Sequence, residues 1–362
     1  MAKRLMAVVG LVLACSSAMA AEHGVKVLSP DQMKIGTSEL NIGLSQNWNQ
    51  PLPAVQRALI VIHGRLRNAQ TYLESGEKAA TQAGQLSTTL VIAPQFLNES
   101  DGTRHTLPND VLRWHANDWM AGEPAISPTP LSSYAAIDQI LQRLGDRKLF
   151  PHLREVVIAG HSGGAQVAQR YALTTQADKA LEAEGIKVRY VIANPSSYAY
   201  FDKQRPVSNF DPATCPGFNT WKYGLKDLPA YVAGQKHHTL EQNYVSRDIT
   251  YLLGAKDTDP NHPALDKSCE AEAQGAYRLI RGHNYFDYLT QRHPQGLNQR
   301  LVEVPGVGHN GDEMFTSPEG QKALFARQAR SYRRGVNSAV DEVRRSLWRA
   351  SRSVRATDCP GR

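Results

Sequence analysis

Short, mostly apolar runs recur along the chain, and a glycine, a proline or a polar residue stops most of them. Runs of this kind are typical of strands buried on both faces, which occur in parallel sheets covered by helices. Six stretches have this form: 58–62, 89–93, 155–159, 188–193, 248–253 and 300–304. Together they predict one central, mostly parallel sheet.

Helix-like stretches alternate with these runs. Residues 133–144 carry their apolar side chains on one helical stripe, and Ser132 or Ser133 can cap this helix. Further helices are expected over 163–172 and from about 318 to 332. The alternation predicts an α/β fold in which a mostly parallel central sheet carries helices on both faces. In such sheets the active site lies beyond the carboxyl ends of the strands, so the residues that follow each strand are the ones to search.

Residues 196–247 break this alternation, because a crossover helix does not need so long a segment. We interpret the segment as a small cap inserted over the active site; an elaborated surface loop is the alternative. Its many rings would give the pocket an apolar wall suited to an acyl or aromatic group. The rings are Tyr198, Tyr200, Phe201, Phe210, Phe218, Trp221, Tyr223, Tyr231 and Tyr244.

Residues 1–20 have the pattern of a secretory signal peptide. Lys3 and Arg4 precede an apolar run over 5–14 that is too short to span a bilayer, and small residues before Ala21 offer a cleavage site. We therefore expect export to the periplasm or the medium, with lipoprotein processing at Cys15 as the alternative. No later segment has an apolar run long enough to cross a membrane.

Positive charge is concentrated near the C-terminus. The formal net charge of +7 falls to +5 when residues 1–20, with two cations and no acids, are removed. We expect residues 21–335 to form the main domain and 336–362 to form a basic extension. A basic stretch can bind nucleic acid or anionic membranes, but no aromatic platform or nucleic-acid motif accompanies this one. A solvated helix face and tail is therefore expected, with no specific nucleic-acid partner.

The exported chain would keep Cys215, Cys269 and Cys359. An oxidising compartment favours a disulfide, and the odd number leaves one thiol over. We expect Cys215 to pair with Cys269 and Cys359 to stay free. The cysteine spacing does not resemble a zinc site, and no metal is expected.

The stretch Gly160-His161-Ser162-Gly163-Gly164 joins a predicted strand to a predicted helix. A serine hydroxyl is a weak nucleophile, which must be exposed at a tight turn within reach of a base. Such a turn strains the backbone of the nucleophile and crowds the residues two places to either side, which are both glycines here. The pattern predicts a nucleophile elbow with Ser162 as the nucleophile.

With this elbow the chain resembles the α/β-hydrolase superfamily, and in particular its secreted serine esterases and lipases, over roughly residues 57–332. The resemblance implies an oxyanion hole made by two backbone N–H groups, those of Gly163 and Arg65. Arg65 is placed in this role by the preceding His63-Gly64 pair, which follows an early strand. We expect the side chain of His63 to pack and support the loop.

The resemblance also implies a carboxylate after a late strand and a histidine after the last one. Asp257 follows Gly254 by three residues and takes the first role, with Asp259 in reserve; a calcium loop here would lack its glycine and its glutamate. His309 takes the second role, with His283 as its rival because that residue also follows the acid. The order Ser162, Asp257, His309 is the order expected of this fold.

Substrate contacts are harder to assign from the sequence. Arg65 and Arg67 lie beside the oxyanion loop, where either can hold a substrate carboxylate or form a salt bridge within the protein. Trp114 and Trp119 belong to a segment that lines the pocket in the superfamily, although tryptophans there can also simply pack.

The resemblance implies hydrolysis of a small-molecule or polymeric carboxylic ester through an acyl-enzyme on Ser162, with no metal or organic cofactor. Three alternatives remain open. The same triad can serve amide, peptide or polymer hydrolysis; the fold can serve a non-catalytic binding protein; and the basic extension can serve an envelope- or nucleic-acid-associated protein. The sequence does not predict the oligomeric state.

Overall fold

The computed structural model describes residues 23–208 and 210–326. The predicted signal peptide, the basic extension 336–362, Cys359 and the end of the predicted final helix lie outside these residues. The described residues up to Phe325 belong to one compact unit. None of the helices that the structure describes is both long and apolar enough to cross a bilayer.

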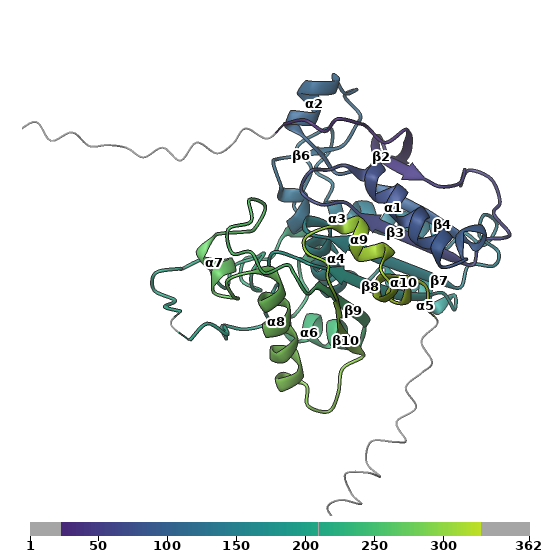
Figure 1. The fold of residues 1–362 in the computed structure, drawn as a ribbon. Helices are drawn as coiled ribbons and strands as arrows, with labels where there is room; N and C mark the ends of the chain where they lie inside the picture. The colour runs from purple at the N-terminus through teal and green to yellow at the C-terminus, as the bar shows by residue number, and fades with distance from the viewer. Residues whose placement is uncertain (1–22, 209, 327–362) are drawn as a thin grey trace, which may run out of the picture. The chain divides into compact units, whose positions relative to one another are not determined.

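Within the described residues, eight strands form one central sheet in the order β1-β2-β4-β3-β7-β8-β9-β10 (Figure 1). The strands from β4 to β10 in this order pair in parallel, whereas β1 and β2 join one edge by antiparallel pairing. The predicted fold class is therefore confirmed. The strands of the sheet are β1 (Asp31–Ile35), β2 (Ser38–Leu44), β3 (Arg57–Ile62), β4 (Thr89–Pro94), β7 (Glu155–His161), β8 (Lys187–Ala193), β9 (Asp248–Gly254) and β10 (Gln299–Val304); β5 (Leu97–Asn98) pairs separately with β6 (Arg113–Trp114).

Each of the six predicted apolar runs is a strand of this sheet, and the ends differ by at most two residues. The antiparallel pair β1 and β2 was not predicted. In β2 the apolar Leu40, Ile42 and Leu44 alternate with polar or small residues. Alternation is typical of a strand joined by antiparallel pairing, and a search for continuous apolar runs does not detect it.

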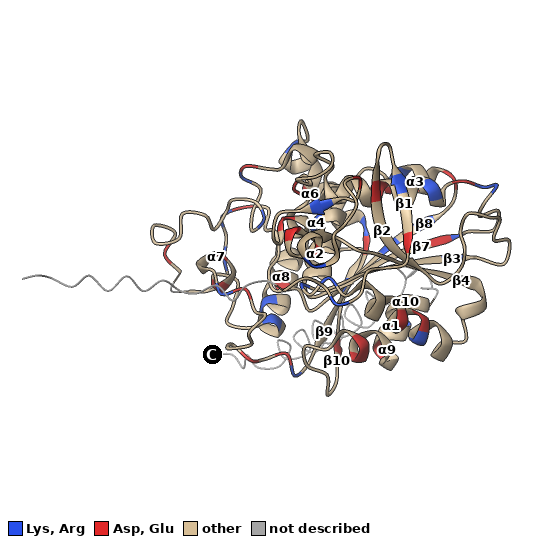
Figure 2. Ribbon diagram, turned by 90° about the horizontal axis from the view of Figure 1, so that it is seen from above, with Lys and Arg blue, Asp and Glu red and all other residues tan. Residues whose placement is uncertain are grey.

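Alternate side chains of the strands enter two separate cores. Ile60 and Ile62 of β3 pack with residues of α3 and α4 on one face, whereas Leu59 and Val61 pack with residues of α1, α9 and α10 on the other. Figure 2 shows these two sets of helices on opposite sides of the sheet. The helices are α1 (Ala69–Gln82), α2 (Glu99–His105), α3 (Ser133–Leu144), α4 (Gly163–Thr174), α5 (Asp178–Ala183), α6 (His237–Ser246), α7 (Cys269–Glu272), α8 (Arg278–Arg292), α9 (Gly311–Thr316) and α10 (Pro318–Phe325), with short 3-10 turns at η1 (Leu86–Thr88), η2 (Asp118–Ala121) and η3 (Ala230–Val232).

The segment 196–247 is mostly irregular and contains η3 and α6. Its first rings are buried against α8 and do not form an open wall. Tyr198 stacks on Tyr285 with ring centres 4.5 Å apart, and Tyr200 lies 4.7 Å from Tyr288. The segment belongs to the same compact unit as the sheet, and its role as a cap stays a prediction.

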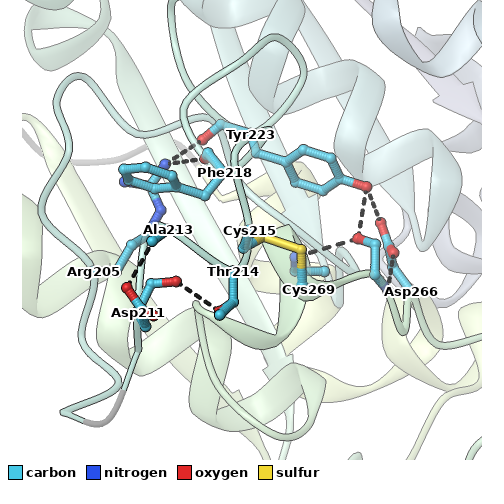
Figure 3. The surroundings of a disulfide bond; sticks show 11 residues. Arg205, Asp211, Ala213, Thr214, Cys215, Phe218, Tyr223, Asp266 and Cys269 are labelled. Atoms are coloured by element: carbon cyan, nitrogen blue, oxygen red, sulfur yellow. Dashed lines mark hydrogen bonds between the residues drawn. A yellow bond between two sulfur atoms is a disulfide. The ribbon is translucent and has the colours of Figure 1, made fainter.

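Cys215 and Cys269 form the predicted disulfide, with an S–S distance of 2.04 Å. The bond joins the segment 196–247 to the first residue of α7, across 54 residues of sequence (Figure 3). A disulfide is compatible with the expected export, because such bonds persist in oxidising compartments.

Candidate active site

Ser162 lies in the turn between β7 and α4, at the carboxyl edge of the sheet. Its φ of 57° and ψ of −115° place its backbone in a region that residues with a side chain rarely adopt. A Cβ on Gly160 would lie 2.1 Å from the carbonyl oxygen of Gly164, and a Cβ on Gly164 would lie 2.1 Å from the carbonyl oxygen of Ile62. The turn that presents the serine therefore requires glycine at both positions.

His309 and Asp257 reach Ser162 from the loops that follow β10 and β9. His309 Nε2 lies 2.9 Å from Ser162 Oγ, and His309 Nδ1 lies 2.7 Å from Asp257 Oδ2. An Nδ1–H that donates to the carboxylate leaves Nε2 free to accept the hydrogen of the serine hydroxyl. The three side chains thus form a continuous relay that can remove a proton from the serine.

The structure does not bring the two rival residues to this relay. The carboxylate of Asp259 accepts a hydrogen bond of 2.8 Å from the backbone N–H of Asn261. His283 Nε2 lies 2.8 Å from Glu303 Oε1 on the exposed side of α8. Within the described residues, neither of them contacts Ser162; His309 contacts Ser162, and Asp257 contacts His309.

Arg278 supports the relay from behind and was missed by the sequence analysis. Its guanidinium is fully buried, donates to Asp257 Oδ1 at 3.3 Å and donates to Ser196 Oγ at 3.0 Å. Each oxygen of Asp257 thus has one partner, because the other oxygen accepts from His309. Arg278 begins α8, 21 residues after Asp257, and no motif in the sequence marks it.

The ring of His309 lies between two other histidines. Its centre is 4.6 Å from the ring of His161 and 5.0 Å from the ring of His262. Burial keeps the pKa of His161 well below its usual range, and the charges of His309 and Arg278 lower it further. His161 therefore stays neutral beside His309.

Burial also lowers the pKa of His309 below its ordinary value. The hydrogen bond with Asp257 raises this pKa, while the nearby charge of Arg278 lowers it. The net direction is downward, so the imidazole is neutral at neutral pH and can act as a base.

Two backbone N–H groups meet beside the serine. The nitrogen of Arg65 lies 3.2 Å from the position that a Cβ on Gly163 would occupy, so the two loops touch here. In the described part of the chain, neither the N–H of Arg65 nor that of Gly163 donates to a protein acceptor. Both groups are therefore free to receive an oxygen atom of a ligand.

His63 holds the loop that carries Arg65. Its ring is buried, lies 2.8 Å from the carbonyl oxygen of Gly64 through Nδ1, and accepts from the N–H of Phe96 at 3.0 Å through Nε2. Burial lowers the pKa of His63 to about 4, which keeps the ring neutral with one donor and one acceptor. These contacts fit the packing role expected for its side chain.

The structure places Arg67, Trp114 and Trp119 away from the substrate side of the site. Arg67 is buried and forms an ion pair of 2.7 Å with Asp101, so its charge is already neutralised. Both tryptophans are fully buried, and the ring of Trp119 packs edge-on against His63 at 4.7 Å. These three side chains support the loops around the site and do not line the two pockets beside Ser162.

Two pockets open on either side of Ser162. The first, of about 300 Å³, is called the insertion-side pocket because the segment 196–247 supplies part of its wall; the second, of about 500 Å³, is called the α1-side pocket. Arg65, Pro263 and Ala264 line both. The insertion-side pocket is further lined by Asn117, Met120, Gly163, Gln166, Ser196, Lys222, Tyr223, Leu265, Asp266 and Lys267, and the α1-side pocket by Gly64, Leu66, Asn68, Thr71, Tyr72, Ser75, His161, His262, His309, Asn310, Gly311 and Asp312.

Of the rings predicted to wall the site, Tyr223 lines the insertion-side pocket among the described residues. The remainder of that wall is largely polar, with Lys222 and Gln166 beside it. The expected apolar wall is therefore wrong for this pocket. The rings of Tyr198, Tyr200 and Phe201 pack against α8 and do not line this pocket.

No protein-family model and no curated protein sequence matches the chain. Solved structures do resemble it. Poly(aspartic acid) hydrolase-1 from Sphingomonas sp. KT-1 aligns with a TM-score of 0.56 at 22% sequence identity, covering 82% of this chain and 99% of that one. The poly(3-hydroxybutyrate) depolymerase LpqC from Bordetella parapertussis aligns with a TM-score of 0.54 at 19% identity, covering 77% of this chain and 81% of that one. Taken with the strand order and the turn between β7 and α4, these likenesses show that the chain has the α/β-hydrolase fold.

Proposed function

We propose that the protein is a serine hydrolase that cleaves carboxylic esters through an acyl-enzyme on Ser162. The observation that carries the proposal is the relay, in which Ser162 Oγ, His309 and Asp257 are joined by contacts of 2.9 and 2.7 Å. A serine at a strained turn, with a neutral and oriented imidazole beside it, is the arrangement that nucleophilic catalysis needs.

In the first half-reaction, Ser162 Oγ attacks the carbonyl carbon while His309 Nε2 takes the hydroxyl proton. The carbonyl oxygen becomes an anion, and the N–H groups of Gly163 and Arg65 stabilise it. When the intermediate collapses, His309 returns the proton to the departing alcohol oxygen, and the acyl group stays on Ser162. In the second half-reaction, a water molecule repeats these steps and releases the acid.

Asp257 and Arg278 act through His309. Asp257 fixes the ring and stabilises its charged form after it has taken the proton. Arg278 holds the second oxygen of Asp257, so that the carboxylate keeps its orientation towards the ring. We assign Arg278 as a positioning residue, since the relay lies between it and the reacting atoms.

A polymeric substrate is the second candidate. Ser162 lies between two pockets, so a substrate with units on both sides of the scissile bond can be accommodated across it. Both fold relatives named above are described as acting on polymers, one of them on poly(aspartic acid). The same relay serves esters and amides, so a panel of small esters, amides and polyesters is the way to separate the substrates.

The test compares Ser162→Ala with Ser246→Ala, which changes an exposed serine at the end of α6. The wild type and Ser246→Ala are expected to hydrolyse p-nitrophenyl esters and to react with a fluorophosphonate probe. Ser162→Ala is expected to lose the label and about 10⁴- to 10⁶-fold in kcat. Hydrolysis retained by a correctly folded Ser162→Ala variant would exclude the mechanism, and a wild type that neither reacts nor hydrolyses would favour a non-catalytic binding protein.

A further inference from the structure

The two pockets differ in which half of a substrate they can hold. The histidine of the relay returns its proton to the leaving group, so the leaving group must lie on the His309 side of Ser162. His309 lines the α1-side pocket, whereas Gly163, an oxyanion donor in the proposed function, lines the insertion-side pocket. The acyl half of the substrate is thereby directed to the insertion-side pocket.

Arg170 lies behind the insertion-side pocket and is fully buried. No carboxylate of the described residues lies within ion-pair distance of its guanidinium, which donates to neutral oxygens instead. This differs from Arg57, Arg189 and Arg247, which have carboxylate partners within 2.8 Å. The oxygens that accept from Arg170 are Lys222 O at 3.0 Å, Met120 O at 3.3 Å, Gln166 Oε1 at 3.1 Å and Ser197 Oγ at 3.0 Å.

Lys222 lines the pocket itself, one residue before Tyr223. In the parts of the chain that are described, its ammonium has no hydrogen bond or ion pair; Nζ lies 5.5 Å from the ring centre of Tyr223. Burial lowers the pKa of Lys222, the charge of Arg170 lowers it further, and Asp266, Asp118 and Glu270 oppose this only from beyond ion-pair distance. Cations removed from water without an anion are costly, and an anionic ligand would offset that cost.

Arg278 and Arg281 add to the positive charge behind the same wall. The carboxylate that Arg278 contacts, Asp257, is shared with His309. Arg281 is buried and donates to backbone carbonyl oxygens, including those of Ser196 and Asp266, which both line the pocket. Among the described residues, Arg170 and Arg281 thus lie behind this wall with no carboxylate within ion-pair distance.

Asp266 is the one carboxylate among the described lining residues, and it is already engaged. It accepts from the hydroxyl of Tyr223 at 2.8 Å and from the N–H of Ser268 at 3.1 Å. Figure 3 shows Tyr223 and Asp266 meeting beside the disulfide, from the two segments that this bond joins. These links fix the position of the wall that carries Lys222 before any substrate arrives.

We propose that the insertion-side pocket binds a carboxylate on the acyl group of the substrate, with Lys222 as its direct partner. The preferred substrates are then esters or amides of acyl groups that carry an anionic group. The proposal rests on the proposed serine hydrolase activity. It also provides the buried charge of Arg170 and the half-buried charge of Lys222 with the counter-ion that the described part of the protein does not supply.

The test uses p-nitrophenyl monoesters of dicarboxylic acids, from succinate to suberate, beside the same esters with the distant carboxyl group methylated. The readout is the ratio of kcat/KM between the charged and the methylated ester, after subtraction of spontaneous release. The wild type is expected to favour the charged ester at the chain length that reaches Lys222. In Lys222→Met this ratio is expected to fall by about 10- to 100-fold, the range of a charge-assisted hydrogen bond.

Lys226→Met is the matched control, because Lys226 is an exposed lysine of the same segment that does not line the pocket. Its ratio is expected to equal that of the wild type. A wild type that prefers the methylated esters at every length, or a Lys222→Met variant that keeps the wild-type ratio, overturns the proposal.

A binding measurement separates failure of this proposal from failure of the proposed function. Millimolar monomethyl adipate should raise the Tm of the wild type and of Lys226→Met more than dimethyl adipate does, and Lys222→Met should lose this difference. If the wild type hydrolyses no ester but shows the difference, the function is wrong and the anion site stands. If no difference appears in the wild type, the anion site is wrong whatever the hydrolysis assay shows.

Discussion

Two groups of buried or half-buried charges flank Ser162, and they differ in how many of their charges have a protein partner of opposite charge. In the relay, Asp257 gives one oxygen to His309 and the other to Arg278, so each of its two oxygens has a protein partner. In the wall of the insertion-side pocket, Arg170 donates only to neutral oxygens, and the ammonium of Lys222 has no hydrogen bond or ion pair within the described residues.

The relay must be ordered before the substrate arrives, whereas the substrate itself can supply the negative charge that the wall lacks. A relay that is already ordered costs no rearrangement during the reaction, which is how preorganised polar groups lower a barrier. A cationic wall without counter-ions favours a ligand that brings the missing negative charge. Variants of the relay should therefore change catalysis for every substrate, whereas variants of the wall should change the choice among substrates.

The largest effect is expected for Asp257→Asn, which keeps the shape of the side chain but removes its charge. An amide can hold the ring of His309 in the wrong tautomer and cannot stabilise its charged form, so kcat should fall about 10⁴-fold for charged and uncharged esters alike. Asp259→Asn is the control, because Asp259 contacts Asn261 and not the relay. Equal losses in the two variants, measured at saturating p-nitrophenyl ester, would contradict the assignment of the acid.

Arg278→Met should have the next largest effect, because it removes one partner of a buried ion pair. The free energy of unfolding is expected to fall by about 3–5 kcal/mol, measured by urea denaturation. The charge of Arg278 lowers the pKa of His309. Removal of this charge should therefore also move the acidic limb of the pH profile of kcat/KM to higher pH. Arg278→Lys keeps the charge and should move the limb less; a limb that does not move in Arg278→Met would show that the residue is merely structural.

Loss of the disulfide is expected to destabilise the segment that carries the wall of the insertion-side pocket more than it disturbs the relay. The pair Cys215→Ser and Cys269→Ser opens a loop closed across 54 residues, and the free energy of unfolding should fall by about 2–4 kcal/mol. The relay residues come from the ends of strands, so kcat for an uncharged acetate ester should change little. Treatment of the wild type with dithiothreitol should reproduce the result, and an unchanged urea midpoint in the double variant would contradict it.

The same contrast explains how much of the site the sequence could predict. Ser162, Asp257 and His309 each follow a predicted strand, and parallel strands bring their carboxyl ends to one edge of a sheet. Local pattern and one rule of topology were enough to predict that these three side chains would meet. The elbow added a local constraint, since Gly160 and Gly164 are needed where backbone atoms approach closely.

Neither the wall nor the support behind the relay could be predicted in this way. Arg170 lies within α4, Arg278 at the start of α8 and Lys222 in an irregular segment, and they meet only through tertiary packing of the segment 196–247. Burial of charged side chains is equally invisible to sequence patterns. Arg67, a predicted substrate contact, is instead buried and paired with Asp101. The carboxylate of Asp101 is held at this place because it also caps the N-terminus of α2.

The smallest expected effect concerns the histidines that flank the relay, and it appears only in the pH profile. Burial lowers the pKa of His309 from its ordinary value, and the base must be neutral to accept a proton. The acidic limb of kcat/KM for an uncharged ester in the wild type should therefore lie below pH 6.5, the ordinary pKa of histidine. A limb at or above that value would contradict the burial argument.

His262→Phe refines this prediction, because it keeps a ring 5.0 Å from His309 and removes a group that can carry charge. His262 lowers the pKa of His309 less than Arg278 does, so the limb should move to higher pH by less than in Arg278→Met. The ratio of kcat/KM between charged and methylated esters should stay at the wild-type value, because His262 lines the α1-side pocket and not the cationic wall. A changed ratio together with an unchanged acidic limb of the pH profile would contradict the contrast drawn above. The relay would then not be independent of the substrate's charge, and the wall would not be the part that recognises it.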